Sequence, residues 1–150
     1  MRTRRAFIIA TMLFTTLITA CSEDDPVTPQ EDHFEAIGMA LYRGDTKVLG
    51  ILRGVTTDTL RATVGVTGED YDVRFYNENE QIVEADDDHE SLGWEIADPS
   101  IVDVVQDAGK EGKFEFRLRG KKAGTTTVEF LIVHEGHADF RSGKIPVVVR

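Results

Sequence analysis

The feature that most constrains the fold of this 150-residue chain is an alternation of apolar and polar residues with a period of two. In the clearest example, Phe114, Phe116 and Leu118 alternate with charged residues. The same alternation recurs in the runs 60–66 and 71–75. Such a pattern places one side of a strand in a core and the other in water. The sequence therefore predicts several half-buried β-strands.

Turn-forming residues separate these runs, for example at Gly44-Asp45, Asp98-Pro99 and Ser142-Gly143. Beyond residue 33, no stretch of about a dozen residues shows the 3.6-residue apolar stripe of an amphipathic helix. Residues 34–150 have the usual length of one domain. Short strands with regular turns predict an all-β antiparallel sandwich over this range.

The first twenty residues predict an export signal. Arg2, Arg4 and Arg5 precede an apolar stretch from 6 to 20, which is shorter than the roughly 20 apolar residues that span a bilayer. Its ending, Leu17-Ile18-Thr19-Ala20-Cys21, resembles the lipobox of bacterial lipoproteins. That resemblance implies a signal peptide over 1–20, cleavage before Cys21, and a lipid carried by Cys21. The alternative is an ordinary secretory signal or an uncleaved anchor with an incidental cysteine.

The segment 21–33 predicts the lipidated cysteine followed by a disordered acidic linker. Its residues from Ser22 to Asp32 include two prolines and almost nothing to bury. The stretch Ser22-Glu23-Asp24-Asp25 also resembles a signal for display on the outer face, although a solvated linker has the same composition. We therefore expect a lipid-anchored protein of the cell envelope, at the outer membrane, on its periplasmic or surface face.

The net charge of the chain limits the classes of partner that it can bind. Removal of residues 1–20, which contain three arginines and no acidic residue, changes the formal net charge from −10 to −13. A nucleic-acid binder needs a basic surface, so we expect no nucleic-acid partner. Attachment to the membrane through an N-terminal lipid needs no basic patch. With Cys21 lipidated, the folded part has no thiol for a disulfide or a nucleophile. We expect a monomer whose partner is an envelope protein or polysaccharide.

Two stretches in the second half carry a more specific resemblance. The run Leu92-Gly93-Trp94-Glu95-Ile96-Ala97-Asp98-Pro99-Ser100 precedes a Val-x-Val strand, and Gly120-Lys121-Lys122-Ala123-Gly124-Thr125 opens a later strand. Together they resemble the bacterial immunoglobulin-like family of the group-2 type, over roughly residues 70–150. The resemblance implies an immunoglobulin-like antiparallel β-sandwich with Trp94 in its core. Residues 36–66 fit it less well and are expected to add strands at one edge. A fold of this kind does not by itself name a function.

The histidines are the candidate functional residues, because none falls inside a predicted strand. Imidazoles with neighbouring carboxylates suit zinc or a similar transition ion. The candidate ligands are His33, Asp86, Asp88, His89, Glu90, His134 and His137.

Strand reversal predicts that two of these segments meet. Four strands are expected between the loop 86–90 and the loop 134–143, and an even number of reversals returns the chain to the end it left. His33 joins them only if the number of strands before residue 86 is even, which depends on whether 81–84 is a strand. His134 and His137 are three residues apart and cannot share a face of a straight strand, but a glycine-containing turn lets them converge.

Other interpretations of the same residues stay open. Asp86, Asp88 and Glu90 alone would suit calcium, although the run lacks the glycine and the spacing of the common calcium loop. Loop histidines are also often only solvated, an acidic run is often a hydrated loop, and the histidines could respond to pH.

Three functional classes follow. We expect a non-catalytic binding or structural module, with a lipoprotein that binds or delivers a divalent, zinc-like transition metal through loop histidines as the alternative. An enzyme acting on envelope polymers is the third class. The sequence has no Gly-x-Ser-x-Gly elbow, no phosphate-binding glycine loop and no cysteine outside the N-terminal segment, so we do not expect catalysis.

Overall fold

The computed structural model describes residues 35–85 and 89–150. The chain divides into two compact units, 1–32 and 33–150, and all the described residues belong to the second. These residues form eleven strands, and no helix among them is long and apolar enough to cross a membrane. The strands are β1 (Gly38–Arg43), β2 (Thr46–Leu52), β3 (Leu60–Ala62), β4 (Tyr71–Tyr76), β5 (Ile82–Val83), β6 (Glu90–Ile96), β7 (Val102–Val105), β8 (Glu115–Gly120), β9 (Gly124–His134), β10 (His137–Arg141) and β11 (Ile145–Val149).

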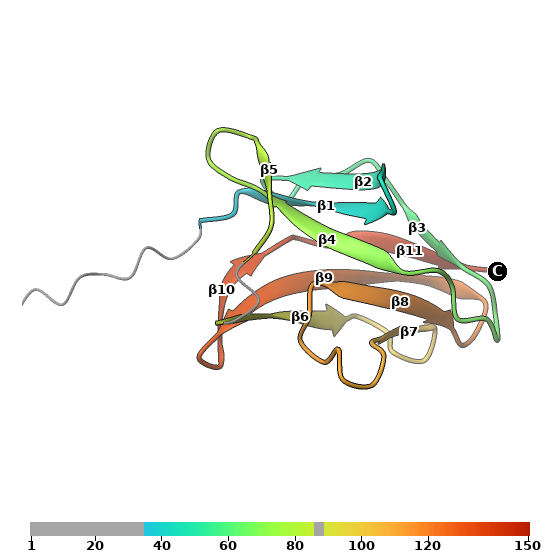
Figure 1. Cartoon of the computed structure of the whole chain (residues 1–150). Helices are drawn as coiled ribbons and strands as arrows, with labels where there is room; N and C mark the ends of the chain where they lie inside the picture. The colour runs from blue at the N-terminus through green and yellow to red at the C-terminus, as the bar shows by residue number, and fades with distance from the viewer. Residues whose placement is uncertain (1–34, 86–88) are drawn as a thin grey trace, which may run out of the picture. The chain divides into compact units, whose positions relative to one another are not determined.

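The strands form two sheets that pack face to face (Figure 1). The first sheet has the order β2-β1-β4-β8-β7, with β5 added to β4. The second is built around the long strand β9, which pairs with β6 along one edge. Its other edge pairs with β11 near the start of the strand and with β10 near its end. β3 then joins β11 in parallel.

This topology is immunoglobulin-like. The order β1-β4-β8-β7 matches the A-B-E-D sheet of such domains, and β6-β9-β11 matches the C-F-G sheet. Strand β2 is an additional edge strand from the N-terminal part of the domain, where the sequence predicts extra strands. The predicted all-β, immunoglobulin-like antiparallel sandwich is confirmed.

The core lies between the inner faces of the two sheets, where the period-two pattern places apolar side chains. Aromatic rings link the sheets. The ring of Phe116 on β8 lies 5.2 Å from that of Tyr71 and 4.5 Å from that of Phe130, and Phe75 meets Phe140 edge-on at 5.6 Å. Such pairs add roughly 0.5–1.5 kcal/mol each beyond the burial of area.

Trp94 packs against this core but is only partly buried. It lies on β6, which pairs with β9 along one edge, while on the other edge the Leu92 amide donates to the carbonyl of Gly112 in the segment before β8. Trp94 therefore packs at the edge of the core rather than at its centre.

The strand predicted over 60–66 is too long. β3 ends at Ala62, and the chain then leaves the sheet through Gly65, whose φ of 75° favours glycine. Val64 and Val66, predicted to alternate into the core, are 44 % and 49 % exposed. Residues 81–84, left open by the sequence, contain the two-residue strand β5.

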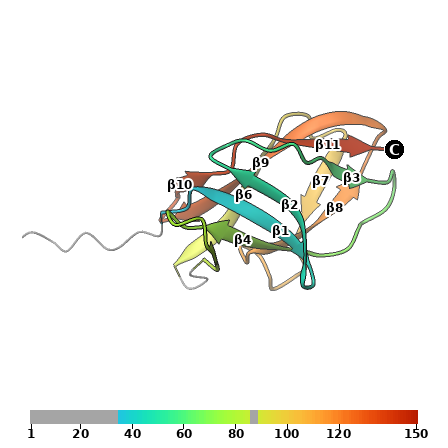
Figure 2. The same ribbon diagram turned by 90° about the horizontal axis from the view of Figure 1, so that it is seen from above.

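The two stretches that carry the family resemblance dock on each other at one end of the sandwich. The Asp98 amide donates to the hydroxyl oxygen of Thr126, and the amides of Lys121 and Lys122 donate to the carbonyl of Ile101. Lys121 Nζ also donates to the carbonyl of Pro99 at 2.7 Å. We call this the turn end. Figure 2 shows β10 at the opposite end, which we call the histidine end.

Candidate metal centre

The histidine end is built on a tight hairpin. Glu135 and Gly136, with φ of 49° and 86°, form the two-residue turn between β9 and β10. Positive φ at both central positions is the type I′ arrangement, whose twist matches that of the paired strands. His134 and His137 flank this turn and are directly opposite each other in the register.

The prediction of a loop over 134–143 with no histidine in a strand is therefore wrong. Gly136 permits a two-residue turn, so the chain re-enters the sheet at once: His134 ends β9 and His137 begins β10. The predicted convergence on a glycine-containing turn is confirmed, since the two imidazole centroids lie 6.0 Å apart.

The predicted meeting of the two segments is also confirmed. Four strands separate them, and Glu90 at the start of β6 pairs in register with His134. Glu90, His134 and His137 thus form a row across three adjacent strands, and directly opposite residues share a face of a sheet. The next row on that face is apolar and buried: Leu92, Ile132 and Phe140. The polar row therefore lies at the rim of the hydrophobic core.

Asp139 completes a group that the sequence analysis missed. The β9–β10 pairing shifts by one residue between Ala138 and Phe140, so Asp139 lies in a β-bulge. Bulges commonly re-aim a side chain beside a functional site. A carboxylate oxygen of Asp139 lies 3.6 Å from His134 Nδ1, and its other oxygen lies 3.2 Å from His137 Nε2. One ligand atom from each of these three residues lies within 4.8 Å of the other two.

The predicted ligands divide into three sets. His134 and His137 are brought together, and Glu90 joins their row without belonging to the three-residue group. His89 is exposed, immediately before β6, and lies outside the group. The predicted ligands His33, Asp86 and Asp88 lie outside the described residues, as does Cys21, the predicted lipidation residue. The sequence offers only the closeness of Asp139 to His137 in the chain, because the approach of Asp139 to both imidazoles depends on the bulge between Ala138 and Phe140.

The outer face of the same hairpin carries an ion-pair network. Arg141 on β10 contacts Glu95 on β6 and Glu129 on β9, each at 3.0 Å. Glu95 and Glu129 are directly opposite in the register, so the guanidinium offsets the repulsion between two carboxylates. The hydrogen bond from Arg141, with its positive charge, lowers the pKa of Glu95. This network ties together the three strands that carry the histidine row.

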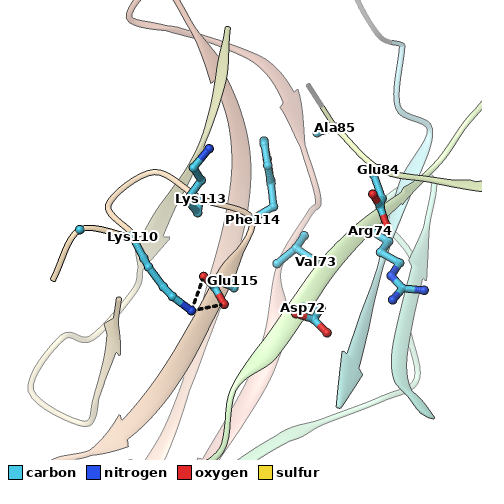
Figure 3. Close-up of a pocket in the computed structure, with 10 residues that line it drawn as sticks. Asp72, Val73, Arg74, Glu84, Ala85, Lys110, Lys113, Phe114 and Glu115 are labelled. Atoms are coloured by element: carbon cyan, nitrogen blue, oxygen red, sulfur yellow. Dashed lines mark hydrogen bonds and ion pairs between the residues drawn. The ribbon is translucent and has the colours of Figure 1, made fainter. Parts of the chain in front are cut away.

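A separate cleft of about 540 Å³ opens between β4, the end of β5 and the segment before β8 (Figure 3). Val73 and Phe114 supply its apolar surface, and its charged groups have both signs. Lys110 pairs with Glu115 at 2.8 Å, and the hydrogen bond that Lys110 Nζ donates to that carboxylate raises the pKa of Lys110. The described lining residues are Asp72, Val73, Arg74, Glu84, Ala85, Gly109, Lys110, Lys113, Phe114 and Glu115. This set offers hydrogen bonds to a polar ligand and contains no hydroxyl, thiol or imidazole nucleophile.

Comparisons with known proteins give structural similarity only. No family model matches the sequence, and no curated protein matches it significantly. Domains 4 and 5 of the S-layer protein SbsC are similar in structure, with 14% identity and a TM-score of 0.43 over 75% of this chain and 65% of that one. Domains 5–6 of the same protein give 14% identity and a TM-score of 0.43 over 61% of this chain and 39% of that one. The chain thus spans less than two thirds of either solved structure.

Proposed function

We propose that this chain is a lipid-anchored protein of the cell envelope and that its immunoglobulin-like sandwich is a non-catalytic binding or structural module. The observation that carries the proposal is the N-terminal segment, in which three arginines and a short apolar stretch lead to Ile18-Thr19-Ala20-Cys21. The acidic composition of the rest supports attachment through lipid rather than through a basic surface. We place the protein at the outer membrane, on its periplasmic or surface face.

Metabolic labelling with an alkyne fatty acid in a bacterial host tests the anchor. We expect the chain to incorporate the label and to fractionate with membranes. Cys21→Ser should lose the label, whereas the neighbouring change Ser22→Ala should keep it. Equal labelling of Cys21→Ser and the unchanged chain, or none in either, would reject the lipid anchor.

The binding role is supported by the mixed-charge cleft between β4 and β8, whose lining combines charges of both signs, among them Lys113 and Glu84, with the apolar surface of Phe114. Co-sedimentation with purified cell-wall polysaccharide, in the presence of a chelator, measures that binding directly. We expect retention that falls when Lys113→Glu is introduced and an unchanged polymer length after incubation. Shortened polymer would instead indicate an enzyme.

A second candidate function, the binding or delivery of a divalent transition ion, is favoured by one observation: the group formed by His134, His137 and Asp139.

A further inference from the structure

We propose that the β9–β10 hairpin binds one divalent transition ion, with zinc as the best fit, through His134, His137 and Asp139. This site supplies what the second candidate function requires, and it does not depend on the lipid anchor. The ligands are one imidazole nitrogen from each histidine and one carboxylate oxygen from Asp139, with a further position open to water or to a ligand from a partner.

The distances fit a tetrahedral ion. Zinc bonds to nitrogen and oxygen are near 2.0–2.1 Å, which puts neighbouring ligand atoms of a tetrahedron about 3.3 Å apart. One carboxylate oxygen of Asp139 lies 3.2 Å from His137 Nε2, and its other oxygen lies 3.6 Å from His134 Nδ1. One ligand atom from each of the three residues lies within 4.8 Å of the other two, so side-chain rotation brings a single oxygen and the two nitrogens to the spacing of a bound ion.

The chemistry of the ligands selects the class of ion. Two imidazoles and one carboxylate suit zinc and its neighbours in the first transition row. Calcium prefers six to eight oxygen ligands, so the same group should discriminate against it. Three protein ligands with one open position is the pattern of zinc sites that exchange water or bind a further ligand.

The scaffold holds the ligands in place before an ion arrives. The histidines face each other across a two-residue turn, and the bulge directs Asp139 toward both. On the other side of His134, β6 fixes the strand through a continuous register, and the apolar row of Leu92, Ile132 and Phe140 lies beneath. An apolar surrounding limits water around a site and strengthens its electrostatic interactions.

The three ligand side chains differ in their exposure to solvent. The side chains of His134 and Asp139 are 13 % and 19 % exposed, whereas that of His137 is 62 % exposed. An ion can therefore enter from the side of His137 and meet two ligands that are already partly desolvated. The competing explanation is that Asp139 forms only an ion pair with protonated imidazole, in which case these groups order the hairpin without binding metal.

Calorimetric titration with zinc separates these explanations. We would use the 150-residue chain with Cys21→Ser, so that its one thiol cannot bind zinc, without a polyhistidine tag, in mild detergent and stripped with a chelator. We expect one saturable site with a Kd of about 1 µM or tighter. His134→Gln, His137→Ala and Asp139→Asn should each weaken binding by more than the roughly 10–100-fold that loss of an outer partner costs.

Matched controls and a second readout keep the result interpretable. His89→Ala removes an exposed histidine beside the row, and Glu129→Gln removes a carboxylate from the outer face of β9, so neither should change the affinity. Cobalt should give the intense visible absorption of a tetrahedral site, which His137→Ala abolishes, and calcium should give no saturable heat. Absence of saturable zinc binding, or equal binding by all three ligand variants, would overturn the proposal. The labelling of Cys21 would be untouched by either result.

Discussion

The two ends of the sandwich use polar groups in opposite ways. At the turn end, the Asp98 amide, the Lys121 side chain and the Ile101 carbonyl are engaged in hydrogen bonds between the two turns. At the histidine end, ligand-type side chains converge at the rim of the core, with His137 open to solvent. The polar groups of the turn end therefore stabilise the fold, whereas the side chains of the histidine end can bind a ligand. The turns of the two stretches that carry the resemblance lie at the turn end, and the candidate site lies at the histidine end.

Gly120→Ala at the turn end should have the largest effect. A Cβ at Gly120 would lie 2.3 Å from the backbone oxygen of Thr63, and neither backbone can move without breaking sheet pairing. We expect a loss of about 3 kcal/mol or more in the free energy of unfolding, the upper range for overpacking. Urea unfolding measures it. Gly68→Ala is the control, because its Cβ would meet only the Leu118 oxygen at an ordinary 3.6 Å. Similar costs for the two changes would contradict the close contact.

Zinc should produce the next largest effect, through the histidine end. An ion that binds only the folded state at a hundred times its Kd adds about 2.7 kcal/mol, which for a domain of this size raises Tm by about 10 °C. Thermal unfolding followed by circular dichroism, with and without zinc, measures the shift. Asp139→Asn should remove it and a turn-end change such as Thr126→Val should leave it intact. A shift that survives Asp139→Asn would place the ion elsewhere.

Thr126→Val tests the hydrogen bond that joins the two turns. Thr126 is 6 % exposed, and its hydroxyl oxygen accepts from the Asp98 amide at 2.9 Å. Replacement by valine keeps the shape and removes the acceptor of that partly buried hydrogen bond, which costs about 0.5–1.5 kcal/mol. Thr126→Ser retains the hydroxyl and should cost less. If serine costs as much as valine, the hydroxyl contributes no more than the methyl group, and the hydrogen bond is not the main contribution of Thr126.

The sequence predicts the strands and the shared end, but not the ligand that completes the site. Strand reversal depends only on the number of strands, so it predicts that residues 86–90 and 134–143 share one end of the domain. It does not predict that Glu90 lies directly opposite His134, because that depends on the register. The bulge at Asp139 depends on a one-residue shift against β9, which no local pattern encodes. Likewise, the end of β3 at Ala62 is set by its pairing with the distant strand β11. Beyond that pairing, the amide of Val64 donates to the carbonyl of Arg150. Long-range pairing thus decided what local alternation could not.

Acid should affect the turn end through Asp98. Its carboxylate accepts from the hydroxyl and the amide of Ser100, and these hydrogen bonds lower its pKa. A lowered pKa contributes stability above the unfolded value near 4 and loses it as the pH falls through the folded value. Asp98→Asn should therefore flatten the fall in unfolding midpoint below about pH 4, with little change at pH 7. An unchanged pH profile would exclude Asp98 from the acid response.

The smallest expected effect is that of His137→Ala without metal, and it is the most informative about the histidine end. The side chain is 62 % exposed, and an exposed contact such as that between His137 and Asp139 contributes about 0–1 kcal/mol. We therefore expect the apo variant to unfold within about 0.5 kcal/mol of the unchanged chain, as surface substitutions do. Chemical unfolding in the presence of a chelator measures this difference. A loss well above 1 kcal/mol would mean that the hairpin needs the imidazole for its own stability. If His137→Ala leaves the unfolding free energy of the apo protein unchanged and also abolishes the rise in Tm with zinc, the imidazole binds the ion. A residue that zinc binding requires and folding does not is a binding residue.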